Sequence, residues 1–143
     1  MDNIDLRIIE LLKGNSRMTS SEISRKIQLS IPAVSERIRK LEESKVIEQY
    51  TVILNRSKLG LCLMAFVLVN VDPQHLSKFR QKVGEMDAVL ECHHIAGESD
   101  YLLKVAVEST SDLERFITKK LKEELSAAKT NTIVVLSTLK EQI

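Results

Sequence analysis

The stretch SIPAVSERIRKLEE, residues 30–43, decides how the first half of the chain folds. Ser30 is a favourable helix N-cap, and Pro32 falls in the first helical turn, where a missing N–H costs nothing. At about 100° per residue, the apolar positions of the stretch fall on one side of a helix. These positions are Val34, Ile38 and Leu41. The stretch therefore predicts an amphipathic helix with one buried face and one polar face.

Two further helices are predicted before this one. Asp2 is placed to cap a helix that ends near Gly14, and residues 19–22, TSSE, have the pattern of a capping box at the start of another. About three residues separate the second helix from the third, a spacing typical of a helix-turn-helix.

Short β segments are expected after the third helix. Residues 46–47 and 50–54 are rich in β-branched side chains, which favour strands, and they would form a small wing. A linker at residues 55–60 would follow. Residues 1–54 are therefore predicted to form a three-helix, winged helix-turn-helix DNA-binding domain.

The polar face of residues 30–43 changes character along its length. Small side chains lie at its N-terminal end and cations lie further along, as a helix in the major groove requires. We therefore expect double-stranded DNA as a partner. The residues expected to contact it are Arg17, Ser20, Ser21, Arg25, Ser30, Pro32, Ala33, Ser35, Glu36, Arg37, Arg39 and Lys40. The alternative is that these are ordinary solvated side chains on two surface helices.

Strand-like and helix-like blocks alternate in the second half of the chain. Strands are expected at residues 61–71, 88–95, 101–107 and 130–139, and helices at residues 73–85 and 111–124. The order βαββαβ predicts an α+β, ferredoxin-like domain at residues 61–143. In such a domain both helices cover one face of an antiparallel sheet.

The first of these strands is apolar on both faces. Its even positions from Cys62 to Leu68 are apolar, and so are its odd positions from Leu61 to Val69. Because successive strand residues point to opposite faces, the face without helices also needs a cover. A second copy of the same sheet is the simplest cover, so a homodimer is expected.

These segments resemble the Lrp/AsnC family of transcriptional regulators, also called feast/famine proteins. The resemblance is carried by Ile4-Asp5-x-x-Ile8-Ile9-x-x-Leu12, by residues 30–42 and by Val46-Ile47-x-x-Tyr50-Thr51, and the second half matches in order. It implies a helix-turn-helix joined to a ferredoxin-like RAM domain. That domain dimerises in the family and often assembles further, commonly to octamers.

The resemblance also implies an amino-acid effector site. The turn Gly97, Glu98, Ser99 and Asp100 is similar to the Gly-x-x-Asp segment at which family members bind small effectors. Backbone N–H groups of such a turn suit an α-carboxylate, and Asp100 suits an α-ammonium group. The alternative is a plain hairpin turn.

Three positions depart from the family pattern. Ser24 stands where Ala is frequent, and Gln28 and Lys45 stand where Gly is frequent. If Gln28 and Lys45 adopt positive φ, each costs about 1 kcal/mol relative to glycine. The departures therefore concern the turns and leave the helix-turn-helix pattern intact.

Composition limits the other classes of protein. No window approaches the roughly 20 apolar residues of a membrane helix, and the acidic start does not resemble a signal peptide, so a cytoplasmic protein without membrane contact is expected.

Cys62 and Cys92 form no CxxC pair and are expected in the core. Residues 1–60 hold 11 Lys/Arg against 8 Asp/Glu, and the remainder holds 10 against 12, so nucleic acid is expected to bind the first part.

No catalytic motif is present, and we expect neither a catalytic residue nor a metal or cofactor. His93 and His94 are adjacent in a predicted strand, so they point to opposite faces and cannot share a metal ion. One enzymatic alternative stays open: proteins similar to this family act as sirohaem decarboxylases in tetrapyrrole synthesis, and one of these histidines could face a pocket.

Overall fold

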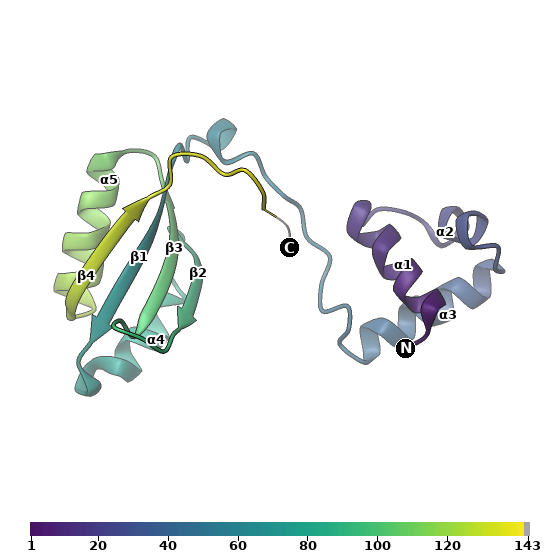
Figure 1. Cartoon of the computed structure of the whole chain (residues 1–143), viewed down its shortest axis with the longest axis horizontal. Coiled ribbons are helices and arrows are strands. Elements are labelled where there is room, and N and C mark those ends of the chain that lie inside the picture. Colours follow the sequence, from purple (N-terminus) through teal and green to yellow (C-terminus); the bar gives the residue numbers. More distant parts are fainter. Residues whose placement is uncertain (142–143) are drawn as a thin grey trace. The chain divides into compact units, whose positions relative to one another are not determined.

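The computed structural model describes residues 1–141, and the chain divides into two compact units, Met1–Leu54 and Asn55–Ile143 (Figure 1). The first unit consists of three helices, α1 (Asn3–Gly14), α2 (Ser20–Ile27) and α3 (Ile31–Glu43). Its apolar core contains one or two side chains from each helix: Ile8, Leu12, Ile23, Val34 and Leu41. The three predicted helices are therefore confirmed.

Each helix of the first unit begins with a side-chain cap, formed by Asp2, Thr19 and Ser30 respectively. In α1 and α2 an acidic side chain three residues further on accepts a hydrogen bond from the backbone N–H of the capping residue. Asp5 accepts from the N–H of Asp2 at 2.8 Å, and Glu22 accepts from the N–H of Thr19 at 2.7 Å. These capping boxes satisfy N–H groups that have no partner inside the helix, so the sequence fixes where the helices start.

The turns that close α2 and α3 use left-handed backbone at residues other than glycine. Gln28 has a φ of 57° and Lys45 a φ of 59°. The N–H groups of Leu29 and Val46, the next residues, donate back to carbonyls of α2 and α3 at 3.2 and 3.0 Å. Positive φ is thus confirmed at the two positions where glycine is frequent in the family.

The strands predicted at residues 46–47 and 50–54 are not present. Residues 46–54 contain no helix or strand, and Val52 and Ile53 are 72% and 77% exposed. A strand requires a neighbour that completes its backbone hydrogen bonds, and residues 46–54 find none within the first unit. β-propensity alone does not supply that neighbour.

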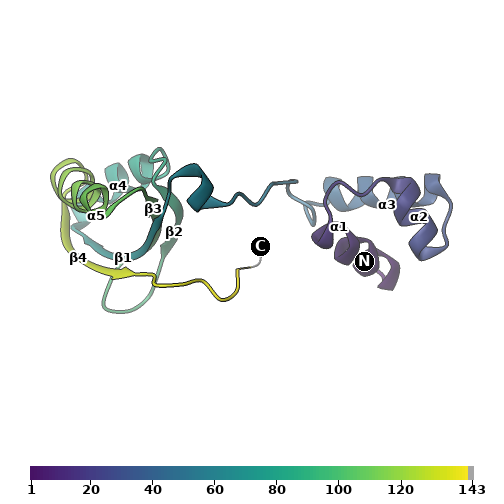
Figure 2. The ribbon, with the colours of Figure 1, turned by 90° about the horizontal axis from the view of Figure 1, so that it is seen from above.

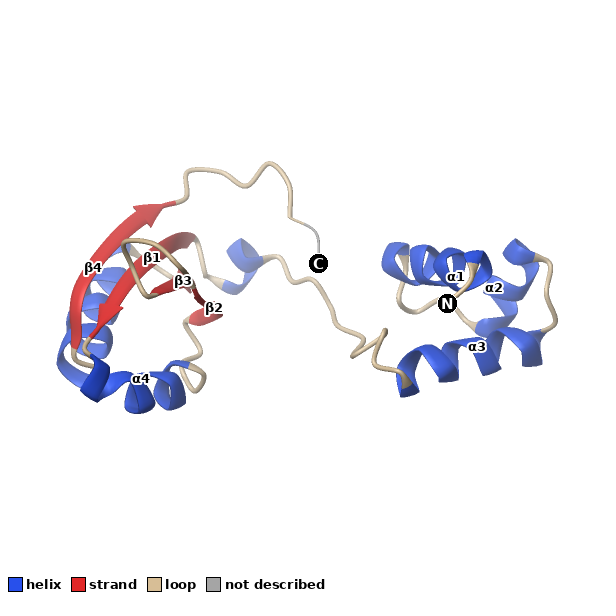
Figure 3. Cartoon of the chain, turned by 60° about the horizontal axis from the view of Figure 1, so that its bottom comes forward, coloured by secondary structure: helices blue, strands red, loops and turns tan. Residues whose placement is uncertain are grey.

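The second unit has the predicted βαββαβ order (Figure 3). Its elements are β1 (Leu63–Val71), η2 (Pro73–His75), α4 (Leu76–Val83), β2 (Val89–His94), β3 (Tyr101–Val107), α5 (Thr110–Arg115), η3 (Phe116–Glu124) and β4 (Ala127–Val134). A 3-10 turn, η1 (Arg56–Leu59), precedes β1 inside the segment predicted as a linker. The segment η3, which continues α5, is a π-helix.

The sheet has the order β2-β3-β1-β4, and all its neighbours are antiparallel. The helices α4 and α5 cover one face, as Figure 2 shows from above. The odd residues of β1 face these helices, and Ala65, Val67 and Val69 are fully buried. This arrangement confirms the ferredoxin-like topology and leaves the other face, here called the open face, without helices.

The last strand lies earlier in the chain than residues 130–139, where we expected it. Its only neighbour is β1, which begins at Leu63, and Val134 already pairs with Ala65. Residues 136–141 therefore have no strand to pair with, and Leu136 and Leu139 are each 97% exposed. The register of β1 decides where β4 ends.

The prediction that both cysteines belong to the core is wrong, because Cys62 and Cys92 are exposed. Cys62 precedes β1, and Cys92 lies on β2, an edge strand of the sheet. Within residues 1–141, none of the helices combines the length and the apolar character needed to cross a bilayer.

Candidate nucleic-acid and effector sites

The residues predicted to contact DNA all lie in the first unit, on α2, on α3 or next to their caps. Eight of them are exposed: Arg17, Arg25, Ser30, Pro32, Ser35, Glu36, Arg39 and Lys40. Ser20, Ser21, Ala33 and Arg37 are half-buried. The exposed face of α3 therefore presents small side chains at its N-terminal end and charged ones further along, as the sequence predicts.

The charged part of this face is held by ion pairs within α3. Arg39 donates through Nε and Nη2 to the carboxylate of Glu36 at 2.9 and 2.6 Å, and through Nη1 to Glu43. The Nζ atom of Lys40 lies 3.7 Å from Oε1 of Glu36. The hydrogen bond from Arg39 lowers the pKa of Glu36, and the same contact raises the pKa of Arg39. The face is therefore less positive than its cations alone indicate.

Arg37 has a different environment from the other predicted contacts. Its Nη1 donates to Asp2 at 2.8 Å and to Asp5 at 2.6 Å, and so it joins α3 to the first turn of α1. Its side chain is 30% exposed. Arg37 holds the helices together in this structure, a role that sequence reasoning missed because the two carboxylates are distant in the sequence.

The predicted effector turn follows β2 and is tied to β1 by hydrogen bonds. The carboxylate of Asp100 accepts from the N–H of Val71 at 2.8 Å, and the side-chain amide of Asn70 donates to the carbonyl of Glu98 at 2.9 Å. Asp100 thus already uses one carboxylate oxygen to position the turn. Glu98 is exposed, and no side-chain hydrogen bond engages its carboxylate among the described residues.

A small hollow of about 160 Å³ lies beside this turn on the open face. It is lined by Leu68, Asn70, Ile95, Glu98, Ser99, Lys129 and Asn131. The turn contributes Glu98 and Ser99, whereas Lys129 and Asn131 come from β4. The hollow therefore combines an anionic and a cationic side chain with two apolar ones, a set that suits a small zwitterion. Sequence reasoning missed the β4 residues because their position depends on strand pairing.

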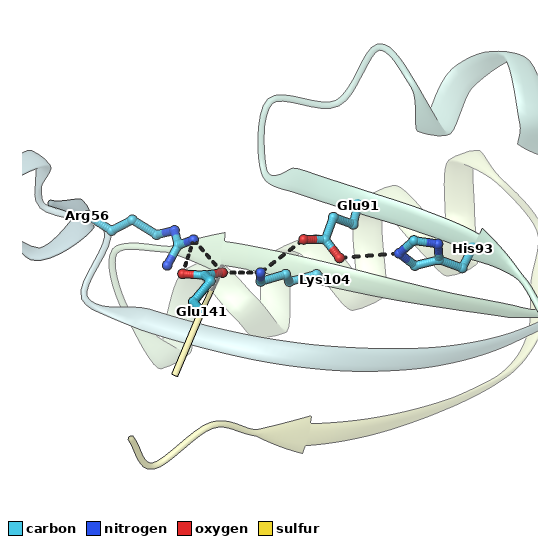
Figure 4. Close-up of polar contacts among 5 residues, drawn as sticks. All are labelled: Arg56, Glu91, His93, Lys104 and Glu141. Carbon is cyan, nitrogen blue, oxygen red and sulfur yellow. Dashed lines mark hydrogen bonds and ion pairs between the residues drawn. The ribbon is translucent and has the colours of Figure 1, made fainter. Parts of the chain in front are cut away.

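The centre of the open face combines apolar side chains with a polar cluster. Met64, Phe66 and Leu68 of β1 are half-buried there, and Ile133 of β4 pairs with Phe66 and is 51% exposed. The polar cluster consists of Arg56, Glu91, His93, Lys104 and Glu141 (Figure 4). Apolar and charged side chains are thus neighbours on this face.

Lys104 stands in the middle of the polar cluster. Its side chain is 12% exposed, and its ammonium group donates to Glu91 at 3.0 Å and to Glu141. Arg56 also donates to Glu141, at 2.9 and 3.0 Å. These contacts lower the pKa of both glutamates, with the Lys104 hydrogen bond as the largest cause in each.

The two histidines point to opposite faces of β2, as predicted. His93 lies 3.2 Å from Glu91 on the open face, and the His94 ring stacks on Tyr101 with centroids 5.0 Å apart. Within residues 1–141, no group of three or more His, Cys, Asp or Glu side chains is arranged to hold a metal ion.

Comparison with known protein families gives a match for each half of the chain. Residues 1–48 match the model described as "Winged helix-turn-helix DNA-binding", and residues 64–143 match "Lrp/AsnC ligand binding domain". The HTH-type transcriptional regulator LrpC of Bacillus subtilis is 40% identical over 119 residues, which cover 83% of each chain. The leucine-responsive regulatory protein of Rhizobium meliloti is 31% identical over 99% of this chain and 92% of its own length.

Solved structures of the same group superpose on the whole chain. A transcriptional regulator of Neisseria meningitidis in complex with L-Met has a TM-score of 0.95 at 26% identity, covering 99% of this chain and 94% of its own. The structure of LrpC from Bacillus subtilis has a TM-score of 0.91 at 37% identity, covering 99% of both chains.

Proposed function

Because the chain belongs to the Lrp/AsnC family of helix-turn-helix transcriptional regulators, we propose that it binds DNA through the exposed face of α3 and responds to an amino acid. One observation supports the proposed binding to DNA. A capped α2 and a capped α3, joined by a short turn, present small residues at the start of α3 and cations beyond them. Small residues permit close approach to base edges, and cations suit phosphates.

We propose the contact residues to be those predicted from the sequence, with Arg37 in a supporting role. Ser30, Pro32, Ala33 and Ser35 would lie nearest the bases, and the remaining donors would contact phosphates. The ion pairs of Arg37 with Asp2 and Asp5 occupy one of its terminal nitrogens, so we propose that Arg37 positions α3 against α1 and makes fewer direct contacts with DNA.

We propose that the functional unit is a homodimer that covers the open face. Met64, Phe66, Leu68 and Ile133 give this face an apolar surface that a second copy would bury. Two helix-turn-helix units would then read half-sites about one helical turn, or a multiple of it, apart. Assembly to an octamer is part of the proposal on the family resemblance alone.

The effector would bind at the turn Gly97–Asp100 and the adjoining hollow. Its α-carboxylate would face Lys129, and its α-ammonium group would face Glu98, since these side chains supply the opposite charges. The Neisseria relative is described as an L-Met complex and the Rhizobium relative as leucine-responsive, so methionine and leucine are the first candidates.

We propose that the chain acts in the cytoplasm, as a DNA-binding regulator, and without catalysis. The sirohaem decarboxylase alternative requires one of His93 and His94 to face a pocket, and neither of them lines the hollow beside the turn Gly97–Asp100. We expect no shift of the Soret band when haem is titrated with the protein, and a shift would count in favour of the enzymatic alternative.

The decisive experiment is fluorescence anisotropy of the full chain with duplex DNA from upstream of its own gene. Scrambled DNA of the same composition serves as the control, at two salt concentrations and with or without methionine and leucine. We expect a preference for the upstream DNA and steep weakening with salt. We also expect Arg39→Ala to weaken binding. If the upstream and scrambled duplexes bind equally, the proposed sequence-specific function is wrong.

A further inference from the structure

The charged part of α3 contains an arginine held between two carboxylates. Glu36, one turn before Arg39, accepts two parallel hydrogen bonds from it, and Glu43, one turn after, accepts a third. All three guanidinium nitrogens of Arg39 therefore have partners on its own helix. The arginine side chain is nevertheless 54% exposed, so a phosphate can reach it.

The charge of this group differs from the charge of Arg39 alone. Glu36, Arg39 and Glu43 together carry a net charge of −1, and the nearby Lys40, 3.7 Å from Glu36, brings the sum to zero. Sequence-independent DNA binding depends on cations that neutralise phosphates. The middle of the α3 face therefore offers little net attraction to a phosphate backbone.

We propose that Glu36 and Glu43 restrain Arg39 and thereby weaken the sequence-independent binding of this helix to phosphates. The proposal rests on α3 being the DNA-contacting helix. To contact a phosphate, Arg39 must exchange carboxylate partners for it. That exchange costs the same free energy on a matching site and on unrelated DNA, so the restraint lowers the affinity for both, and only a matching site supplies base contacts that offset the cost. In this role the two carboxylates act through Arg39 and so are positioning residues, apart from the contact proposed for Glu36 at a matching site.

The expected size of the effect follows from the exposure of the ion pairs. Surface pairs of this kind are individually weak, at about 0.2–1 kcal/mol each, so releasing two of them changes a dissociation constant by roughly two- to thirty-fold. The released arginine should also neutralise about one more phosphate. The slope of log K against log salt should then steepen by about 0.9.

The test compares the wild-type chain with the double variant Glu36→Gln/Glu43→Gln. Anisotropy with a scrambled duplex and with the upstream duplex gives both dissociation constants, at about 50 and about 200 mM salt. We expect the double variant to bind the scrambled duplex roughly two- to thirty-fold more tightly, with a steeper salt slope. The upstream duplex should gain by a similar factor, because the same exchange of partners is no longer needed there.

Two controls separate restraint of Arg39 from a general gain in positive charge. Glu10→Gln/Glu42→Gln removes the same number of carboxylates from exposed positions of α1 and α3 that do not contact Arg39. Arg39→Ala provides a background in which Glu36→Gln/Glu43→Gln should have a much smaller effect on the scrambled duplex, left by the loss of two negative charges and the release of Lys40 from Glu36. A gain of equal size in the control pair, or one that is undiminished without Arg39, overturns the proposal.

The same measurements keep this inference distinct from the proposed function. Equal binding of both duplexes by the wild-type chain counts against the sequence-specific function. The gain of the double variant on scrambled DNA, and its dependence on Arg39, still decides whether the two carboxylates restrain the arginine.

Discussion

The guanidinium of Arg37 donates to the carboxylate of Asp5 at 2.6 Å, across 32 positions of sequence. The bond joins the middle of α3 to the first turn of α1, and the same nitrogen also reaches Asp2. These contacts lower the pKa of both carboxyl groups; the capping bonds between the two aspartates are the largest cause in each, and Arg37 adds to them. One residue of the third helix thus reinforces the cap of the first.

We expect Arg37→Met to lower the melting temperature by a few degrees near neutral pH, since the substitution keeps the stem and removes the charge. A carboxyl group whose pKa is depressed in the folded state contributes stability above its unfolded pKa. That stability is lost as the pH falls through the folded value. The deficit should therefore shrink as the pH falls below the ordinary Asp pKa of about 3.9.

Circular dichroism melts of the full chain across this pH range provide the measurement. Lys13→Met is the matched control, because Lys13 makes only an exposed pair with Glu10 at 3.3 Å. A deficit of Arg37→Met that is independent of pH would show that the aspartates do not carry its effect.

Glycine at the two left-handed positions should stabilise the first unit. Gln28 and Lys45 have φ values of 57° and 59°, which cost a side-chain-bearing residue about 1 kcal/mol. Part of the gain is lost to the flexibility of glycine in the unfolded chain, so Gln28→Gly and Lys45→Gly should each add about 0.5 kcal/mol.

Urea unfolding measures the change in free energy. Arg7→Gly, at an exposed position inside α1, is the opposite control and should cost about 1 kcal/mol. If Gln28→Gly and Lys45→Gly destabilise the chain as Arg7→Gly does, backbone strain at these turns is not a factor.

The contrast between these turns and residues 46–54 shows what the sequence could predict. Caps such as Thr19 with Glu22, and turns such as Gln28, depend on neighbours within a few residues, so their patterns predicted the helices correctly. Strands depend on partners elsewhere. Residues 46–54 have the composition of a strand but no partner. The last strand lies at Ala127–Val134 and not at residues 130–139, because it can pair only as far as β1 extends, and β1 begins at Leu63.

The same distinction applies to the candidate sites. The exposed face of α3 follows from helical periodicity, so its residues could be named in advance. Lys129 reaches the hollow beside Glu98 only through the pairing of β4 with β1, and Arg37 reaches Asp5 only through helix packing. Neither contact has a short-range signal in the sequence.

Phe66→Glu should separate the proposed dimer into monomers. Phe66 lies in the middle of the open face, opposite Ile133 and Lys104, where a partner sheet would bury it. Lys104 already donates to Glu91 and Glu141, so a carboxylate at position 66 adds a negative charge that this lysine does not neutralise. Burying that charge in the interface is unfavourable by several kcal/mol, so dissociation should increase by at least about a hundred-fold.

Light scattering after size-exclusion chromatography gives the mass in solution. Thr118→Glu adds the same charge on the exposed side of η3 and should leave the assembly intact. A wild-type chain that is monomeric at high concentration would contradict the dimer, and an unchanged mass for Phe66→Glu would place the interface elsewhere.

Lys129→Ala should weaken amino-acid binding by roughly ten- to a hundred-fold, because a charge-assisted hydrogen bond to the α-carboxylate contributes about 1.5–3 kcal/mol. Calorimetry with methionine and with leucine measures the affinity directly. Lys119→Ala removes the same charge from η3, where Lys119 pairs with Glu123 at 3.1 Å, and should leave the affinity unchanged.

Glu98→Gln should weaken binding of the amino acid while sparing its deaminated analogue, because only the amino acid brings an ammonium group to that side of the hollow. Loss of affinity for both ligands in Glu98→Gln would instead mean that the turn positions the hollow and does not contact the ammonium group.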